Sequence, residues 1–281
     1  MTSIISFRDS ALPGGGITLD DIPFPRGGMI TRIGAEAVAA AGGSVSALID
    51  YETQAAYGLS SPALQGCMKQ QSLHEQGYLA GDRATPAANL TGYGIVDAAT
   101  GLTGATLFGG RSALTIAALV GSAAGSEGDD YGAGKTILGG SPTGTSTPML
   151  KFMLSSANSL VLTARHSAVS QAASQVGFSG LVPGRFYLAI GEIDFVNKTM
   201  ALEVDGVRRS VSAFAGTTGN SVAPSGLGMA WFVQRVGSGQ NVGSQFTGIC
   251  REAFVSSGLL SDVGKRMLRE YWRPYQRQLN G

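Results

Sequence analysis

The sequence carries little charge. Asp, Glu, Lys and Arg make up 14 % of its 281 residues, against about 25 % in ordinary soluble domains, and the formal net charge is +1. Because positive and negative charges nearly cancel, the composition does not indicate a basic surface that would bind nucleic acid or an anionic membrane. Because soluble domains depend on surface charge to stay apart, this composition favours a protein whose surface is partly covered by partners.

Cysteine, histidine and long apolar runs are also scarce. Cys67 and Cys250 are too few for a disulfide framework or a metal site, so we expect two buried free thiols. The histidines, His74 and His166, lie in no sequence typical of a catalytic nucleophile. No run reaches the roughly 18 apolar residues of a membrane helix, and the N-terminus lacks the pattern of a secretory signal. We therefore expect a protein made in the cytoplasm that needs no cofactor and inserts into no membrane.

Glycine, by contrast, is abundant, with 42 residues, and one glycine-rich stretch resembles a nucleotide-binding loop. "GAGKT" ends at Thr136, but a P-loop needs its first glycine where Asp129 stands. Asp129 and Asp130 would also repel a phosphate. Glycines and a proline after Lys135 prevent the helix that should follow. We therefore reject nucleotide binding and expect Lys135 to be an exposed loop lysine.

The N-terminal region divides from the rest by composition. Residues 1–28 contain "LPGGG" and "IPFPRGG", which predict an extended arm that packs along a body or a neighbouring subunit. Residues 29–281 are expected to form one sandwich domain. Within it, the alanine-rich segment 35–41 is predicted to be a helix that ends at a pair of glycines.

From about residue 105 onward the chain reads as short β-type runs separated by glycine-rich turns. Predicted strands lie within 105–110, 112–120, 149–156, 159–166, 184–195, 199–214, 228–236 and 246–257. Asp205-Gly206 divides one of these segments and predicts a two-residue hairpin turn. A helix is predicted over 261–272, with Ser261 as its N-cap and Pro274 just beyond its end. Many strands and one terminal helix predict an all-β fold, an antiparallel double-sheet β-sandwich.

Two segments resemble a known family. "PGRFYLAIGEIDFVNKTMALEVDGVRRS" is similar to the central hairpins of concanavalin A-like and laminin-G-like jelly rolls. "FTGICREAFVSSGLLSDVGKRMLREY" resembles the end of such domains, and the likeness covers roughly residues 105–275. A sandwich of this kind with a Gly/Pro-rich arm resembles phage virion proteins, namely tail-fibre or tail-tip adhesins and capsid decorations. The resemblance implies a structural, non-enzymatic virion protein that forms a homo-oligomer, contacts other virion proteins and adheres to host glycans.

A shorter likeness supports a different class of function. "GEIDFVN" resembles the catalytic strand of laminarinase-type glycan hydrolases, in which a nucleophilic Glu and an acid/base Glu flank the scissile bond. Glu192 and Asp194 match two positions of that motif. The third is Asn197, which cannot serve as a carboxylic acid. A glycan hydrolase with an altered acid/base is therefore one alternative. If the protein is not a hydrolase, the same residues are expected to be a solvated pair of carboxylates on the polar face of a strand.

Sugar binding requires an aromatic ring and nearby polar groups, usually on loops. The sequence offers three candidate positions for such a site, and a free carbohydrate-binding module is therefore a second alternative. The Asp129-Asp130 pair could also hold Ca²⁺ if carbonyl oxygens joined it, although an adjacent pair alone predicts no metal site. Ordinary polar loops would explain the same residues. The candidates are Asp129, Asp130 and Tyr131, Arg165 and His166 at a strand end, and Gln240 and Asn241.

Overall fold

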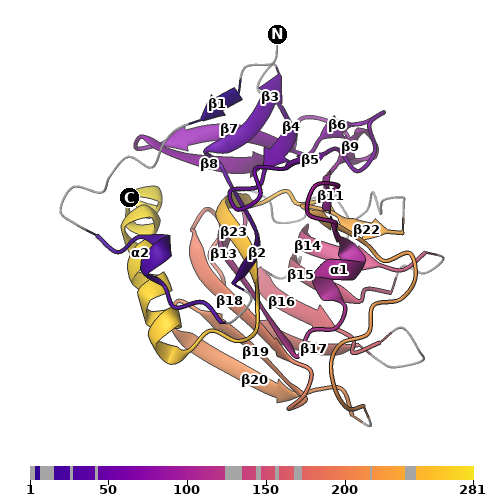
Figure 1. The fold of residues 1–281 in the computed structure, drawn as a ribbon. Helices are drawn as coiled ribbons and strands as arrows, with labels where there is room; N and C mark the ends of the chain where they lie inside the picture. The colour runs from indigo at the N-terminus through magenta and orange to yellow at the C-terminus, as the bar shows by residue number, and fades with distance from the viewer. Residues whose placement is uncertain are drawn as a thin grey trace.

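The fold is an antiparallel double-sheet β-sandwich with one long C-terminal helix (Figure 1). The computed structural model describes residues 4–6, 16–25, 28–41, 44–123, 135–143, 147–155, 158–167, 173–215, 217–237 and 245–281. For strand β1 and for Ala41 and Ala87, only the backbone is described.

The larger sheet has twelve strands within the described residues. In spatial order they are β1 (Ile4–Ser6), β3 (Ala37–Ala41), β4 (Ser44–Ile49), β7 (Met68–Leu73), β8 (Gln76–Gly81), β23 (Ile249–Ser257), β13 (Ala113–Gly121), β18 (Tyr187–Asp194), β19 (Thr199–Val204) and β20 (Val207–Ser212), with β2 (Met29–Gly34) paired to β23 and β5 (Ala56–Gly58) to β4. Every pairing in this sheet is antiparallel.

The facing sheet has seven strands in the described part of the chain. They are β10 (Tyr93–Gly94), β21 (Gly228–Trp231), β14 (Lys135–Ser141), β15 (Leu150–Ser155), β16 (Ser159–Ala164) and β17 (Ser174–Phe178), with β22 (Gln234–Val236) paired to β14. Short pairs join β11 (Val96–Asp97) to β12 (Leu102–Thr103) and β6 (Gln65–Gly66) to β9 (Leu90–Thr91). The helices are η1 (Leu19–Asp21), η2 (Ala87–Asn89), α1 (Gly104–Phe108) and α2 (Asp262–Asn280).

Strand β13 shows why the sequence contains a continuous apolar run. All nine of its residues are buried, and alternate side chains enter two different cores. Leu114 and Ile116 point into the main core between the sheets, whereas Ala117 and Leu119 join a second core on the outer face. A strand covered on both faces needs apolar side chains in both directions.

The second core lies between the larger sheet and α2. Leu268 and Trp272 from α2 pack there, together with Leu19 and Ile22 from the N-terminal segment. Phe24 adds an edge-on contact to Phe254, with ring centroids 5.5 Å apart. Residues 16–25 of the expected arm therefore lie against their own chain.

The predicted hairpin is confirmed. Strands β19 and β20 pair with Val204 opposite Val207, and the two turn residues have positive φ angles, 49° at Asp205 and 87° at Gly206. Positive φ at both central positions is the geometry of the tight hairpin turn that Asp-Gly favours.

The prediction of a helix at 35–41 was wrong. Residues 37–41 form strand β3, which pairs with β1 and β4. Alanine favours a helix, but seven residues cannot offset the cost of nucleating one. Strand pairing on both sides buries Val38 and Ala39 instead.

The strand predicted at 105–110 was also wrong, since residues 104–108 form the one-turn helix α1. Thr103 caps this helix by accepting a hydrogen bond from the backbone N–H of Thr106, at 3.2 Å. The Thr106 hydroxyl in turn accepts from the Thr103 N–H at 2.7 Å. This reciprocal cap normally uses Glu or Gln at the position of Thr106, so the usual sequence pattern of a helix start is absent here.

The C-terminal helix is longer than predicted. Ser261 caps it as expected, accepting from the N–H of Gly264 at 3.0 Å, but Pro274 lies inside the helix. Proline removes one backbone hydrogen bond and usually ends a helix. Here Tyr275 and Leu279 are buried in the second core beyond it, and this packing offsets the loss.

Lys135, Cys67 and Cys250 also differ from or agree with their predicted environments. Lys135 is only 5 % exposed and begins β14, so the prediction of an exposed loop lysine was wrong: its strand pairs with β15 inside the sheet. Cys67 and Cys250 are free and buried, as predicted. Burial raises the pKa of both thiols well above the ordinary value. In the described residues no helix is long and apolar enough to span a membrane.

Candidate functional site

Most of the predicted ligand-binding residues cannot be placed. Asp129, Asp130 and Tyr131 lie outside the described residues, and so do Gln240 and Asn241. Among the residues that are described, no group of three or more His, Cys, Asp or Glu side chains could hold a metal ion.

Arg165 and His166 are described, and His166 is a core residue. It is 4 % exposed, and its ring lies edge-on to Phe195 and Phe214, with centroids 6.0 and 6.2 Å away. Its Nε2 lies 3.0 Å from the carbonyl oxygen of Gly219. The ring of His166 is therefore enclosed by the core rings of Phe195 and Phe214 and is not open to a ligand at the strand end. Arg165 is partly exposed.

The carboxylates of the hydrolase-like motif form ion pairs and hydrogen bonds with neighbouring side chains. Glu192 is 3 % exposed and pairs with Arg208 and with the Nζ of Lys265, the latter at 3.2 Å. Asp194 accepts two hydrogen bonds from Asn197, one from its backbone N–H and one from its side-chain amide, both at 2.8 Å. The two carboxylates are thus buried and bonded, and the expectation of a solvated pair was wrong.

Glu192 belongs to a layer of ion pairs between α2 and the outer face of the larger sheet. Glu252 is a second member, and it pairs with Arg32 and accepts from the indole N–H of Trp272 at 2.7 Å. Burial alone would lower the pKa of Arg32, but the charge of Glu252 raises it above the ordinary value. The layer fixes α2 on the sheet in one position.

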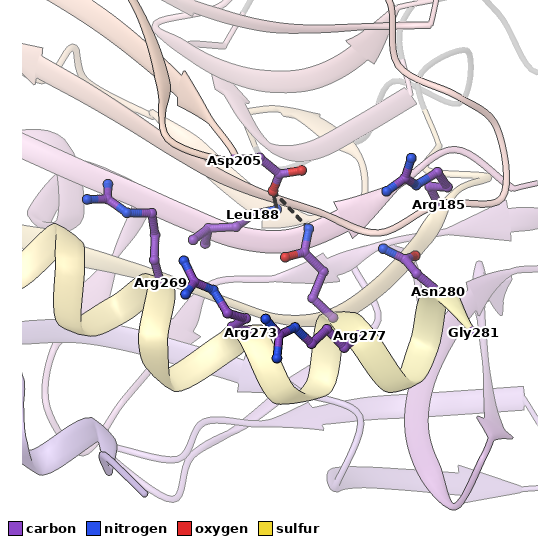
Figure 2. Close-up of a pocket in the computed structure, with 9 residues that line it drawn as sticks. Arg185, Leu188, Asp205, Arg269, Arg273, Arg277, Asn280 and Gly281 are labelled. Carbon is purple, nitrogen blue, oxygen red and sulfur yellow. Dashed lines mark hydrogen bonds between the residues drawn. The ribbon is translucent and has the colours of Figure 1, made fainter.

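A groove opens beside this layer, between the C-terminal half of α2 and the beginning of β18 (Figure 2). Its volume is about 570 Å³. The lining is rich in guanidinium and amide groups and includes Arg185, Leu188, Asp205, Arg269, Arg273, Gln276, Arg277, Asn280 and Gly281. Arg269, Arg273 and Arg277 stand on the helix side of the groove, and Arg185 and Asp205 stand on the sheet side.

The helix side follows from the helical repeat. Arg269, Arg273 and Arg277 are spaced by four residues, which places them on one face of α2. Gln276 and Asn280 lie along the same side and bind the sheet: the amide groups of both donate to the carbonyl oxygen of Phe186, at 2.9 and 3.0 Å. The last turns of the helix are therefore held firmly against the strand.

Two features position the sheet side. Gly121 approaches the chain so closely that a Cβ on it would lie 1.8 Å from the carbonyl oxygen of Arg185, so only glycine permits this path. Asp205 sits in the confirmed hairpin turn. Its Oδ1 accepts from the backbone N–H of Leu188 at 3.0 Å and from the side chain of Gln276 at 2.8 Å.

The charges of the groove are only partly balanced. Arg269 pairs with Glu203, and the Arg185 guanidinium lies 5.8 Å from the centre of the Tyr187 ring. In the part of the chain that the structure describes, no acidic side chain forms an ion pair with Arg185, Arg273 or Arg277. The groove therefore presents three guanidinium groups to solvent.

A second depression, of about 440 Å³, lies where β19 begins and β20 ends. Its lining includes Lys198, Ser174 and Phe214, and Phe214 is the residue whose ring contacts His166. The depression has hydroxyl groups but only one charged side chain, so it offers less recognition chemistry than the groove.

The groove could not be predicted from the sequence because the helix was expected to end at residue 272. Arg273 and Arg277 then appeared to follow the helix, and their spacing from Arg269 carried no meaning. A helix continued through Pro274 would have revealed the arginine face. The partner side could not be found in this way, because Phe186 and Asn280 are 94 residues apart in the chain.

No protein-family model matches the sequence, and no curated protein matches it either. Several solved structures are similar in fold. The CBM40 domain of the Ruminococcus gnavus IT-sialidase is 13 % identical, with a TM-score of 0.46 over 63 % of this chain and 90 % of that domain. The botulinum neurotoxin serotype G binding domain is 10 % identical, with a TM-score of 0.50 over 88 % of this chain and 51 % of that one.

The sialidase of Trypanosoma rangeli, in complex with 2,3-difluorosialic acid, is 12 % identical. It gives a TM-score of 0.52 over 97 % of this chain and 36 % of its own length. This chain thus spans about half of the toxin domain and about a third of that sialidase. At such low identity, the likeness shows a shared β-sandwich fold, and function has to be inferred from the site.

Proposed function

We propose that this chain is a non-enzymatic glycan-binding protein that serves as an adhesive or decorating component of a phage virion, with a concanavalin A-like sandwich as its scaffold. The groove between α2 and β18 supports the binding role. It combines guanidinium donors with a carboxylate acceptor on rigid elements, and such a set suits the hydroxyl and acidic groups of a saccharide.

The contacts of Glu192 support a role in binding rather than hydrolysis. A retaining glycosidase needs two carboxyl groups about 5.5 Å apart on either side of the scissile bond. Glu192 is enclosed by Lys265 and Arg208, and Asp194 is bonded to Asn197. Neither carboxylate is presented to a substrate.

The virion part of the proposal is supported by the family resemblance and by the low share of charged residues. A protein with so few charges gains solubility when neighbours cover part of its surface. We expect it to form a homo-oligomer and to contact other virion proteins.

A glycan array with the purified protein tests the binding role, and a turnover assay on laminarin and lichenan tests the hydrolase alternative. We expect retention on at least one class of glycan and no release of reducing sugar. Turnover that disappears in Glu192→Gln would make the protein a hydrolase, and no retention on any glycan would remove the binding role.

Labelling of intact particles with an antibody to the protein would locate it on the virion, and its absence from particles would contradict the virion part of the proposal.

A further inference from the structure

We propose that the groove recognises a saccharide carrying a carboxylate or sulfate group, with Arg273 and Arg277 binding the anion and Asp205 accepting hydroxyl protons. This inference rests on the proposed glycan-binding function and names the class of glycan. It depends on three features of the groove: its unbalanced positive charge, its single carboxylate, and its lack of aromatic residues.

The positive charge is gathered where a ligand can reach it. Arg273 and Arg277 are exposed and stand one helical turn apart beside the cavity (Figure 2). Each guanidinium can make two parallel hydrogen bonds to a carboxylate or sulfate. Arg277 also lies in the last turn of α2, where a cation interacts favourably with the helix dipole. That interaction does not explain Arg273, which lies one turn earlier.

Asp205 distinguishes a saccharide from a bare polyanion. Its Oδ1 is occupied by Leu188 and Gln276, while its Oδ2 makes no hydrogen bond within the described residues. A carboxylate oxygen without a donor beside these arginines weakens the attraction for a phosphodiester chain, which brings only acceptors along its backbone. A sugar brings hydroxyl donors for Asp205 and an anionic group for the arginines at once.

The lining explains why the charged group should dominate affinity. None of the residues that line the groove is aromatic, so an uncharged sugar finds no ring on which to stack. The volume of about 570 Å³ falls within the range of small-molecule sites, which suits a short saccharide. Gln276 and Asn280 hold the walls in place without a ligand, so little ordering is required on binding.

The test compares charged glycans with their uncharged parents. On a glycan array we expect sulfated and carboxylated members to be retained above the parents of the same core. Calorimetric titration with lactose, lactose 3′-sulfate and 3′-sialyllactose then gives affinities, and we expect at least one charged derivative to bind about tenfold more tightly than lactose. Raising NaCl from about 50 to about 500 mM should reduce that difference, since salt screens exposed charges.

Substitutions locate the site. Arg273→Gln and Arg277→Gln, singly and together, should weaken binding of the charged derivative, by about tenfold or more in the double variant. The melting temperature should fall only slightly, through the lost dipole interaction of Arg277. Arg266→Gln is the matched control, because this arginine is exposed on the same helix but does not line the groove. Asp205→Asn keeps a residue that favours the turn and should weaken saccharide binding without weakening binding of inorganic sulfate.

Each contrary result is distinct. If no glycan on the array is retained, the proposed function fails and this inference fails with it. Equal retention of charged and uncharged glycans, or binding that survives in the double arginine variant, would overturn this inference alone. Tighter binding of a thymidine dodecamer than of any charged glycan would make the groove a nucleic-acid site. Tighter saccharide binding by Asp205→Asn would overturn the role of that carboxylate.

Discussion

Individual carboxylates in this protein are buried with dedicated donors. Asp82 is 1 % exposed and pairs with the Nζ of Lys69 at 3.0 Å. Thr85 donates through its hydroxyl and Gln65 through its amide, at 2.9 and 3.0 Å. Burial alone would raise the pKa of Asp82, but these bonds hold it below the ordinary value of 3.8.

The lowered pKa of Asp82 predicts a loss of stability in acid. The unfolded chain binds a proton to this group at a higher pH than the folded chain does. The stabilising contribution is therefore complete above about pH 5 and is lost as the pH falls through 4 and below the folded-state pKa. We expect Asp82→Asn to lower the free energy of unfolding by about 2 kcal/mol at pH 7, and by less as the pH drops to 3.

Urea unfolding of both proteins at several pH values measures this difference. Asp20→Asn, at an exposed position, is the control and should show little effect. A gap between the wild type and Asp82→Asn that stays constant from pH 7 to pH 3 would show that Asp82 does not bind its donors as a carboxylate.

Because Glu192 forms buried ion pairs, we expect its substitution to change the stability of the fold and not a catalytic activity. Lys265 is 8 % exposed, so replacing its partner leaves a buried ammonium with weaker compensation from the exposed Asp262. We expect Glu192→Gln to lower the free energy of unfolding by about 3 kcal/mol. Combining it with Lys265→Met should restore much of the loss, because the unpaired charge is removed as well.

Urea midpoints of the single and double variants decide this prediction. Glu270→Gln, exposed on the same helix, is the matched control and should be neutral. If Glu192→Gln had the midpoint of the wild type, the ion pair beneath α2 would contribute nothing.

Among the elements, the β19–β20 hairpin gives the sharpest prediction. At Gly206 the φ angle is 87°, and a Cβ there would meet only Arg269, at 3.9 Å. The cost of a side chain is therefore conformational and not steric crowding. We expect Gly206→Val to lower the free energy of unfolding by more than about 1 kcal/mol, because a β-branched residue strongly disfavours this φ.

Gly177→Ala in strand β17 is the comparison for that hairpin. Its Cβ would meet nothing closer than 3.7 Å, and its φ is not positive, so a small effect is expected. Denaturant midpoints for the two variants should differ clearly. Equal midpoints would mean that the turn tolerates a side chain and that Gly206 is not required there.

The predictability of each element depended on how locally it is determined. The Asp205-Gly206 turn and the cap at Ser261 are fixed by a few neighbouring residues, and the sequence revealed both. Strand β3 and the continuation past Pro274 are fixed by distant packing against other strands and the second core, so local propensity gave the wrong answer. The groove could not be predicted because it joins the part of α2 beyond Pro274, which local propensity assigned wrongly, to Arg185, which is distant in the chain.

At the scale of the whole molecule, the N-terminal segment has two described parts, strand β1, which pairs with β3, and residues 16–25. Residues 16–25 contribute Leu19 and Ile22 to the second core, whereas residues 7–15 lie outside the described part of the chain. Removal of residues 1–15 also removes the edge strand β1, which pairs with β3, so we expect some loss of stability, but a smaller one than on removal of residues 1–24. Removal of residues 1–24 should cost on the order of 4 kcal/mol, because it uncovers the apolar surface around Phe254.

Thermal unfolding of the two truncated proteins measures this contrast, and light scattering of the same samples measures assembly. We predict that the shorter truncation already reduces assembly, since contact with neighbouring subunits remains the proposed role of residues 1–15 outside strand β1. Equal melting temperatures for both truncations would show that residues 16–24 do not stabilise the fold.

The location of Gly281 has a practical consequence. This residue lines the groove beside Asn280 (Figure 2), so any peptide joined to it emerges within the volume that a ligand would occupy. A polyhistidine tag attached at that point would place imidazoles next to Arg277 and compete for the same space. A sensor surface that captured the protein through such a tag would therefore hide the groove.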